Sequence, residues 1–133
     1  MKVIFFILIA LMAATRLRSQ CDESQMVAEK NFGSNFIAEP QHVQGIISRG
    51  DSLSFESLWI ADNTYRIATS ATEKQTINIT IFDKNKNIIF DGSEFNYPSD
   101  WDFFVERSLE VRCVIRCEMP EPACVTVLTG FRK

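Results

Sequence analysis

Five oxygen-bearing side chains between residues 83 and 94 have the spacing of a cation-binding loop. They occupy positions 1, 3, 5, 9 and 12 of the calcium-loop template, and they are Asp83, Asn85, Asn87, Asp91 and Glu94. Carboxylate and amide oxygens are the ligands that a hard cation prefers. The template also needs glycine at position 6 for its sharp turn, and Ile88 stands there, at the start of an apolar run typical of a strand. The sequence therefore predicts a hairpin turn without a metal, and a calcium loop built by these five residues is the weaker alternative.

The four cysteines are the second group with chemistry, and they predict two disulfide bonds. An even number of cysteines in a small exported chain is typical of disulfides rather than of free thiols. Cys113 and Cys117 stand four residues apart on one predicted strand, so their Cα atoms lie ~13 Å apart, beyond the ~7 Å that a disulfide spans. A hairpin that turns over residues 118–123 places Cys117 opposite Cys124. We therefore predict the pairs Cys117–Cys124 and Cys21–Cys113.

Residue types that catalysis or a cofactor would need do not come together in the sequence. His42 is the one histidine, and no Gly-x-Ser-x-Gly nucleophile turn is present. A zinc site of the usual cysteine and histidine type is not expected once the cysteines are oxidised. The carboxylates are numerous, which a solvated acidic surface explains. We expect a protein without catalytic activity or cofactor, and the alternative is a small secreted hydrolase or inhibitor with an unrecognised site.

Residues 1–19 have the composition of a secretory signal peptide. Lys2 precedes an apolar run of 12 residues, Val3–Ala14, which is too short for a bilayer span, and a polar stretch follows. Cleavage after Ser19 would remove three basic residues and would change the formal net charge from −3 to −6. This acidic balance argues against nucleic acid and against anionic membrane surfaces as partners. The sequence thus predicts a secreted or periplasmic protein whose residues 20–133 form one domain.

One short helix and a series of strands are predicted for this domain. Residues 22–32 have helical spacing, with Asp22 placed to cap the helix and Gly33 to end it. The clearest strand is Thr76–Ile81, where three isoleucines face one way and polar side chains face the other. Further strands are expected at residues 53–60, 64–70, 88–91, 101–106, 108–117 and 124–131. The pattern predicts an all-β fold, a small antiparallel β-sandwich of jelly-roll type with about six to eight strands.

The order of these strands resembles a known bacterial family. Thr64 and Tyr65 open an alternating strand, the isoleucine strand ends in Phe82–Lys86, and an aromatic strand and a final hairpin follow. This order is similar to the pre-peptidase C-terminal type of β-sandwich domain. Gln20 followed by Cys21, with a cysteine-containing last strand, also resembles small exported Bacteroidetes proteins of unknown function. Both resemblances imply export and a sandwich fold, and neither implies a catalytic residue.

Aromatic side chains gather in the predicted strand 101–106 and in the loop before it. Most of them are expected in the core, because a small sandwich needs their bulk. A ring that projects from the surface could instead stack on a sugar or bury an apolar side chain of a partner. Tyr97 and Trp101, together with Trp59 beside another loop, are the candidate ligand contacts. The sequence therefore predicts an exported binding or accessory module for a protein or glycan that it does not identify.

Overall fold

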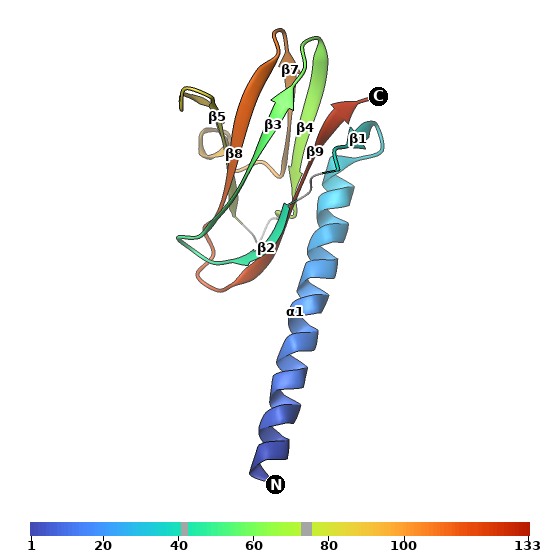
Figure 1. Cartoon of the computed structure of the whole chain (residues 1–133), viewed down its shortest axis with the longest axis vertical. Helices are drawn as coiled ribbons and strands as arrows, with labels where there is room; N and C mark the ends of the chain where they lie inside the picture. Colours follow the sequence, from blue (N-terminus) through green and yellow to red (C-terminus); the bar gives the residue numbers. More distant parts are fainter. Residues whose placement is uncertain (41–42, 73–75) are drawn as a thin grey trace.

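The computed structural model describes residues 1–40, 43–72 and 76–133, and for residues 13–20 it describes the backbone alone. His42 lies outside the described residues. In this part of the chain, two antiparallel sheets pack face to face and one long helix lies against them (Figure 1). The elements are α1 (Lys2–Phe32), β1 (Phe36–Ala38), β2 (Val43–Ile47), β3 (Ser52–Trp59), β4 (Asn63–Thr69), β5 (Ile77–Asp83), β6 (Ile88–Asp91), the 3-10 turn η1 (Gly92–Phe95), β7 (Asp100–Val105), β8 (Leu109–Cys117) and β9 (Ala123–Arg132).

The two sheets confirm the predicted antiparallel sandwich. One sheet has the order β1-β9-β4-β7, with β2 also pairing with β9, and the other has the order β3-β8-β5-β6. We call them the five-stranded and the four-stranded sheet. Two of the strands, β1 and β2, were not predicted. They are short and half exposed, so they lack the sustained alternation that marks a buried strand.

The core between the sheets is built by the inward side chains of the central strands. Ile77, Ile79 and Ile81 of β5 are at most 1% exposed, which confirms the predicted alternation of that strand. Ile79 lies opposite Ile115 of β8, and from the other sheet Val125 adds a side chain that is fully buried. Removal of this apolar surface from water is the main source of stability for such a fold.

The predicted C-terminal hairpin is wrong. β8 pairs with β3 and β5, whereas β9 pairs with β1, β2 and β4, so the chain crosses from one sheet to the other between Cys117 and Ala123. Two β-branched runs around a proline-containing turn occur both in hairpins and in connections between sheets. The pattern therefore does not distinguish the two arrangements. β9 is buried at seven successive residues, Cys124–Gly130, because it has a sheet on one face and the helix on the other.

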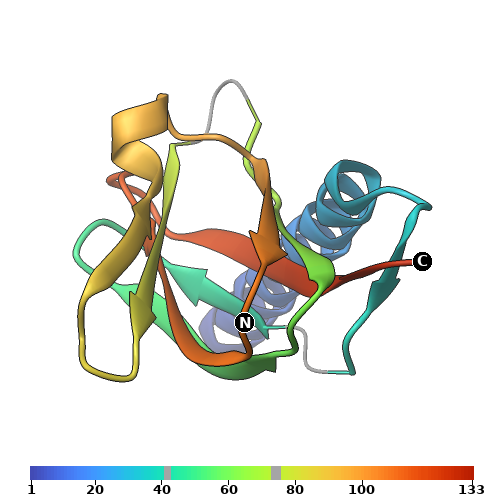
Figure 2. The same cartoon turned by 90° about the horizontal axis from the view of Figure 1, so that it is seen from above.

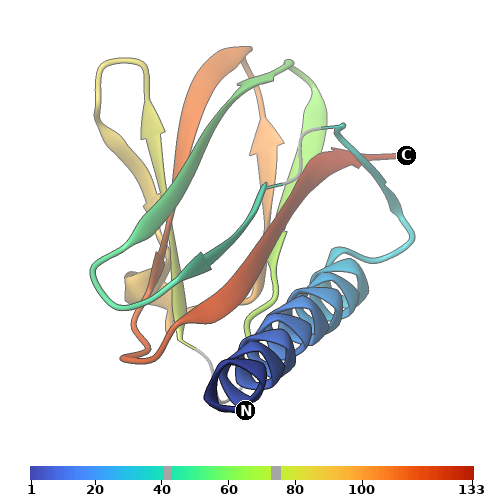
Figure 3. The same cartoon turned by 60° about the horizontal axis from the view of Figure 1, so that its bottom comes forward.

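Helix α1 covers the outer face of the five-stranded sheet. Its C-terminal part places Ala28 and Phe32 against Ala68 of β4 and Leu128 of β9, and Figure 3 shows it running beside β9. The helix begins at Lys2 rather than at residue 22, and its apolar N-terminal turns project beyond the sheets with exposed side chains (Figure 1). Among the described residues, no helix combines the length and the mean hydropathy of a membrane span.

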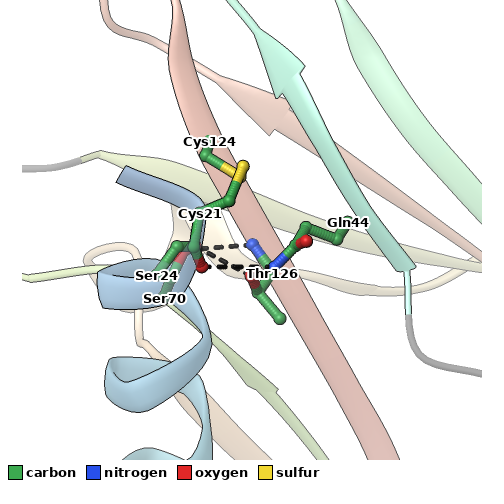
Figure 4. The surroundings of a disulfide bond; sticks show 6 residues. All are labelled: Cys21, Ser24, Gln44, Ser70, Cys124 and Thr126. Atoms are coloured by element: carbon green, nitrogen blue, oxygen red, sulfur yellow. Dashed lines mark hydrogen bonds between the residues drawn. A yellow bond between two sulfur atoms is a disulfide. The ribbon is translucent and has the colours of Figure 1, made fainter. Parts of the chain in front are cut away.

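The predicted cysteine pairs are wrong, because Cys21 of α1 is joined to Cys124 of β9 (Figure 4). Their Cα atoms lie 5.1 Å apart, and Cys113 and Cys117 are free and buried. Cys124 lies on the outer face of the five-stranded sheet beneath the helix, whereas Cys117 points into the core from the other sheet. Cys113 and Cys117 are not bonded to each other, as the sequence predicts. The error was to assume that every cysteine is oxidised.

Candidate functional site

The three aromatic residues predicted as ligand contacts differ in their exposure. Trp59 is 2% exposed and stacks on Tyr65 with ring centroids 5.3 Å apart, so its ring faces are taken up by the core. Trp101 is half buried. Tyr97 is 40% exposed in the loop before β7, where it has a positive φ of 53° and its backbone N–H donates to the Gly92 carbonyl. Of the three residues, Tyr97 is the most exposed.

Five aromatic rings form a continuous chain from the surface into the core. In order they are Phe95, Trp101, Phe90, Phe103 and Trp59. Successive ring centroids lie 4.8, 5.0, 5.1 and 5.2 Å apart, within the contact range of aromatic pairs. Phe95 at the outer end is 49% exposed and Trp59 at the inner end is buried. Of the aromatic cluster predicted from the sequence, Phe95, Trp101 and Phe103 belong to these packed rings, whereas Tyr97 and Phe104 are exposed.

These rings close the side of the sandwich where each sheet ends. β6 is the last strand of the four-stranded sheet and β7 is the last strand of the five-stranded sheet. Phe90 of β6 contacts Trp101 and Phe103 of β7, so the two end strands lie on the same side of the molecule. η1 and the loop after it connect them (Figure 2). Side chains, and not a ladder of backbone hydrogen bonds, join the sheets here.

An apolar hollow of about 370 Å³ opens between β6 and β7. Ile89 of β6 and Phe104 of β7 flank it and are 46% and 65% exposed. The buried Trp59 contributes to its floor, and the indole Nε1 of this residue has no hydrogen-bond partner among the described residues. We call this feature the β6–β7 hollow, and its further lining residues are Phe103, Val105, Glu106, Arg107 and Leu109.

Exposed apolar side chains concentrate in residues 88–104, and two of them, Ile89 and Phe104, line the hollow. Outside α1, nine large apolar residues of the described chain are exposed, and five of them fall within residues 88–104. These five are Ile88, Ile89, Phe95, Tyr97 and Phe104. Single exposed apolar residues are ordinary on a soluble protein, whereas a contiguous group marks an interaction surface. Ile89 was not predicted as a contact residue. Residues 88–90 are all apolar, and because successive side chains of a strand point to opposite faces, at least one of them must face away from the core.

Acidic side chains line the outer side of β7. Asp100 and Asp102 project from this strand, and Glu106 follows it at the rim of the hollow. Asp102 is held by Arg66 of β4, whose Nε donates to Oδ1 at 2.6 Å and whose Nη2 donates to Oδ2 at 2.9 Å. Asp100 accepts only the hydroxyl of its neighbour Ser99, at 3.3 Å, among the described residues. Asp100 and Glu106 therefore give this apolar surface a negative border.

A larger groove, of about 820 Å³, lies on the outer face of the four-stranded sheet. Its side chains alternate in charge, and Glu56 of β3 lies directly opposite Arg112 of β8 in the sheet register. Ser52 and Ser54 add hydroxyl groups, and Arg116 is a second exposed cation on β8. Interspersed charges of both signs on an open sheet face are what a solvated surface carries. The smaller hollow is the better candidate, because it combines concavity with aromatic walls.

Two of the five proposed calcium ligands, Asp83 and Asp91, accept hydrogen bonds from neighbouring residues of the turns and strands. Asp83 Oδ1 accepts from the backbone N–H groups of Asn87 and Asn85, and these bonds hold the pKa of Asp83 below its usual value. Asp91 Oδ1 accepts from Ser93 and from Asn78, with the same effect on the pKa of Asp91. No group of three histidine, cysteine or acidic side chains suited to a metal occurs in the described part of the chain. The segment forms the hairpin between β5 and β6.

The free thiols do not provide a nucleophile. Cys113 is fully buried between the sheets, and desolvation is the main cause that raises the pKa of its thiol to about 12, with a smaller effect from Glu39. The thiolate is the reactive form of cysteine, so a buried thiol with a raised pKa is inert near neutral pH. Cys117, four residues along the same strand, is 1% exposed. Both cysteines act as small core residues.

The fold and the hollow together describe a disulfide-linked sandwich with an apolar recess at its open side. Comparison with known proteins found no matching family model and no matching curated protein. Among solved structures, the chain is similar to PliG of Aeromonas hydrophila, described as a periplasmic lysozyme inhibitor of g-type lysozyme. The TM-score is 0.53 at 10% sequence identity, and the match covers 69% of this chain and 85% of that chain. At this identity the likeness shows a shared fold.

Proposed function

We propose that this chain is an exported, non-catalytic inhibitor that binds a partner protein through the β6–β7 hollow. The observation that carries the proposal is the hollow itself. The exposed side chains of Ile89 and Phe104 line it together with the buried ring of Trp59, and the charged pair Glu106 and Arg107 adds polar groups. Apolar recesses of this kind receive the anchor residues that dominate binding between proteins, while the polar rim excludes wrong partners.

Export is supported by the disulfide and by the composition of residues 1–19. A disulfide between Cys21 and Cys124 is stable in oxidising compartments and rare in the cytosol. The signal peptide stays a prediction, as does its cleavage after Ser19. Cleavage there would leave Cys21 at the start of the processed chain, still bonded to β9 and holding the remaining turns of α1 on the sheet. The proposed location is therefore the periplasm or the medium.

A g-type lysozyme is the first partner to test. The fold is shared with a protein whose described role is inhibition of that enzyme, although a shared fold carries many functions. The acidic balance of the chain, with 17 Asp and Glu against 14 Lys and Arg, favours a partner with a basic surface. The proposed mechanism is occlusion of the partner by a bound protein and needs no chemistry from this chain.

The experiment mixes the purified chain with a g-type lysozyme and measures lysis of cell-wall substrate together with the heat of binding. We expect saturable inhibition at equal molar amounts. The variant Ile89→Asp places a charge in the hollow and should weaken binding at least ~tenfold. Ile46→Asp is the matched control, because Ile46 of β2 has the same exposed fraction of 46% on another face. If heat of binding is measured with a soluble glycan but not with lysozyme, the chain is a sugar-binding module instead. Absence of both binding and inhibition would exclude g-type lysozyme as the partner.

A further inference from the structure

We infer that β7 receives an extended segment of the partner as an additional strand, with one apolar side chain of that segment in the β6–β7 hollow. This inference rests on the proposed function and names the binding mode of the same site. Among the described strands, β7 pairs with β4 alone, so none of these strands lies hydrogen-bonded along its other edge. Extended peptides bind such edges through main-chain hydrogen bonds, and pockets for alternate side chains give specificity.

The two edges of the four-stranded sheet are less suited to an added strand. β3 is long, but Ser57 donates a hydrogen bond to Glu39 and Leu53 packs at Gly45 of β2, so Glu39 and β2 lie beside it. β6 has four residues, and its register with β5 shifts between Ile81 and Phe82. β7 keeps a continuous register with β4 over six residues, from Asp100 to Val105. Natural sheets protect edges by covering them, by bulges or by charged residues, and β7 has no bulge in its register but carries Asp100 and Asp102.

The side chains of β7 specify the chemistry of the added segment. Outward residues alternate as Asp100, Asp102 and Phe104, while Trp101 and Phe103 face inward. Asp102 already has the two hydrogen bonds from Arg66, and Asp100 has no cation within ion-pair distance among the described residues. A cross-strand neighbour of opposite charge stabilises a strand pair, and an apolar neighbour suits an exposed aromatic ring. The segment should therefore carry Lys or Arg opposite Asp100 and an apolar residue opposite Phe104.

A second copy of this chain fits the edge poorly. When a two-fold axis relates two paired β7 strands, their outward side chains lie on the same face of the joined sheet. Each outward residue of one strand then lies opposite an outward residue of the other. The available registers place Asp102 opposite Asp102, Asp100 opposite Asp102, Asp100 opposite Glu106, or Asp102 opposite Glu106. Like charges directly opposite each other destabilise a strand pair. The negative border thus favours a basic segment of another protein over self-association.

The closing experiment uses a peptide that is independent of any lysozyme. The probe is a short acetylated peptide of alternating lysine and valine with one phenylalanine, and binding is followed by NMR shifts and amide hydrogen exchange of the purified chain. We expect shifts confined to β7, η1 and β6, and exchange of alternate β7 amides slowed at least ~tenfold. The same peptide with alternate backbone nitrogens methylated should not bind, because it cannot donate to the edge. Equal binding of the methylated peptide, or shifts on another face, would overturn the inference.

Two variants separate this inference from the proposed partner. Asp100→Lys and Phe104→Gln should each weaken peptide binding at least ~fivefold, while the controls Glu56→Lys and Leu58→Gln on β3 leave it unchanged. If lysozyme is inhibited and both β7 variants inhibit as well as the parent chain, strand addition is wrong and the inhibitor function stands. If the peptide binds but lysozyme does not, the edge site stands and the partner is another protein. A dimer in solution that Phe104→Gln dissociates would assign the edge to a second copy and overturn the inference.

Discussion

Arg66 and Asp102 form a two-bond ion pair that joins β4 to β7. They are direct register partners, with nitrogen to oxygen distances of 2.6 and 2.9 Å. The third guanidinium nitrogen, Nη1, donates to the Phe32 carbonyl at the end of α1, at 3.0 Å. The guanidinium also lies 4.1 Å from the ring centroid of Phe36. The hydrogen bond that Arg66 donates to Asp102 is the main cause that raises the pKa of Arg66. One side chain therefore connects the edge strand β7, its neighbour and the helix.

Arg66→Ala should lower the free energy of unfolding by about 1–2 kcal/mol, measured by urea denaturation. The value is below that of a buried charge pair, because the two side chains are 21% and 33% exposed. Arg112→Ala is the control, since Arg112 is exposed and has no ion pair among the described residues. The change there should stay within about 0.5 kcal/mol. Equal losses in the two variants would show that Arg66 is an ordinary surface cation.

The disulfide should be the main covalent constraint on α1. A non-reducing peptide map should give one cross-linked pair, Cys21 with Cys124, and two free thiols. The linked residues are 103 positions apart, so the double variant Cys21→Ser, Cys124→Ser should lose about 2–5 kcal/mol of stability. Hydrogen exchange should then rise first in the amides of the docked turns, near Ser24 and Ala28. A map that joins Cys117 to Cys124 would contradict the structure.

Alternation along the chain was enough to predict the sandwich, but not its connections. Ile77, Ile79 and Ile81 had to face one way, and burial of that face required a second layer. Nothing local tells whether the strand before Pro120 and the strand after it share a sheet. That choice depends on what covers β9, and the cover is α1, more than 90 residues earlier in the chain.

The candidate site could be located only roughly from the sequence, for a similar reason. The sequence shows that aromatic residues are concentrated at 95–104. It does not show which rings face the core, because inward and outward side chains alternate along one strand. Phe104 projects because its neighbours Phe103 and Val105 fill the core. Trp59 was predicted at the surface from its place beside a loop, and it is buried because Tyr65 and Phe103 stack on it. Which side of a strand faces the core is a property of the partner sheet.

Stability should fall in alkaline solution as the Cys113 thiol ionises. Its pKa is raised by burial from an ordinary ~8.5 to about 12, so the folded state keeps a proton that the unfolded chain releases. The stability that the protonated thiol contributes to the folded state is fully present below pH ~8.5 and is lost as the pH rises toward 12. Urea denaturation of the parent chain and of Cys113→Val between pH 8 and 11 should show the parent losing stability relative to the variant. If the difference in the free energy of unfolding between the parent and Cys113→Val stayed constant over this pH range, the raised pKa of Cys113 would be refuted.

Gly130→Ala should be strongly destabilising, because the backbone of β1 lies against this position. A Cβ built on Gly130 overlaps the carbonyl oxygen of Ile37 and comes within 2.8 Å of the Phe32 ring. The Ile37 atoms are backbone and the Phe32 ring is buried, so β1 and the end of α1 must move. We expect a loss of about 2–3 kcal/mol in urea denaturation. Gly45→Ala is the control, since its Cβ would meet only the mobile Leu53 methyl group at 2.9 Å, and its cost should be under half as large. Similar losses at the two glycines would mean that β1 does not pack as closely on β9 as the register Ala38 to Gly130 requires.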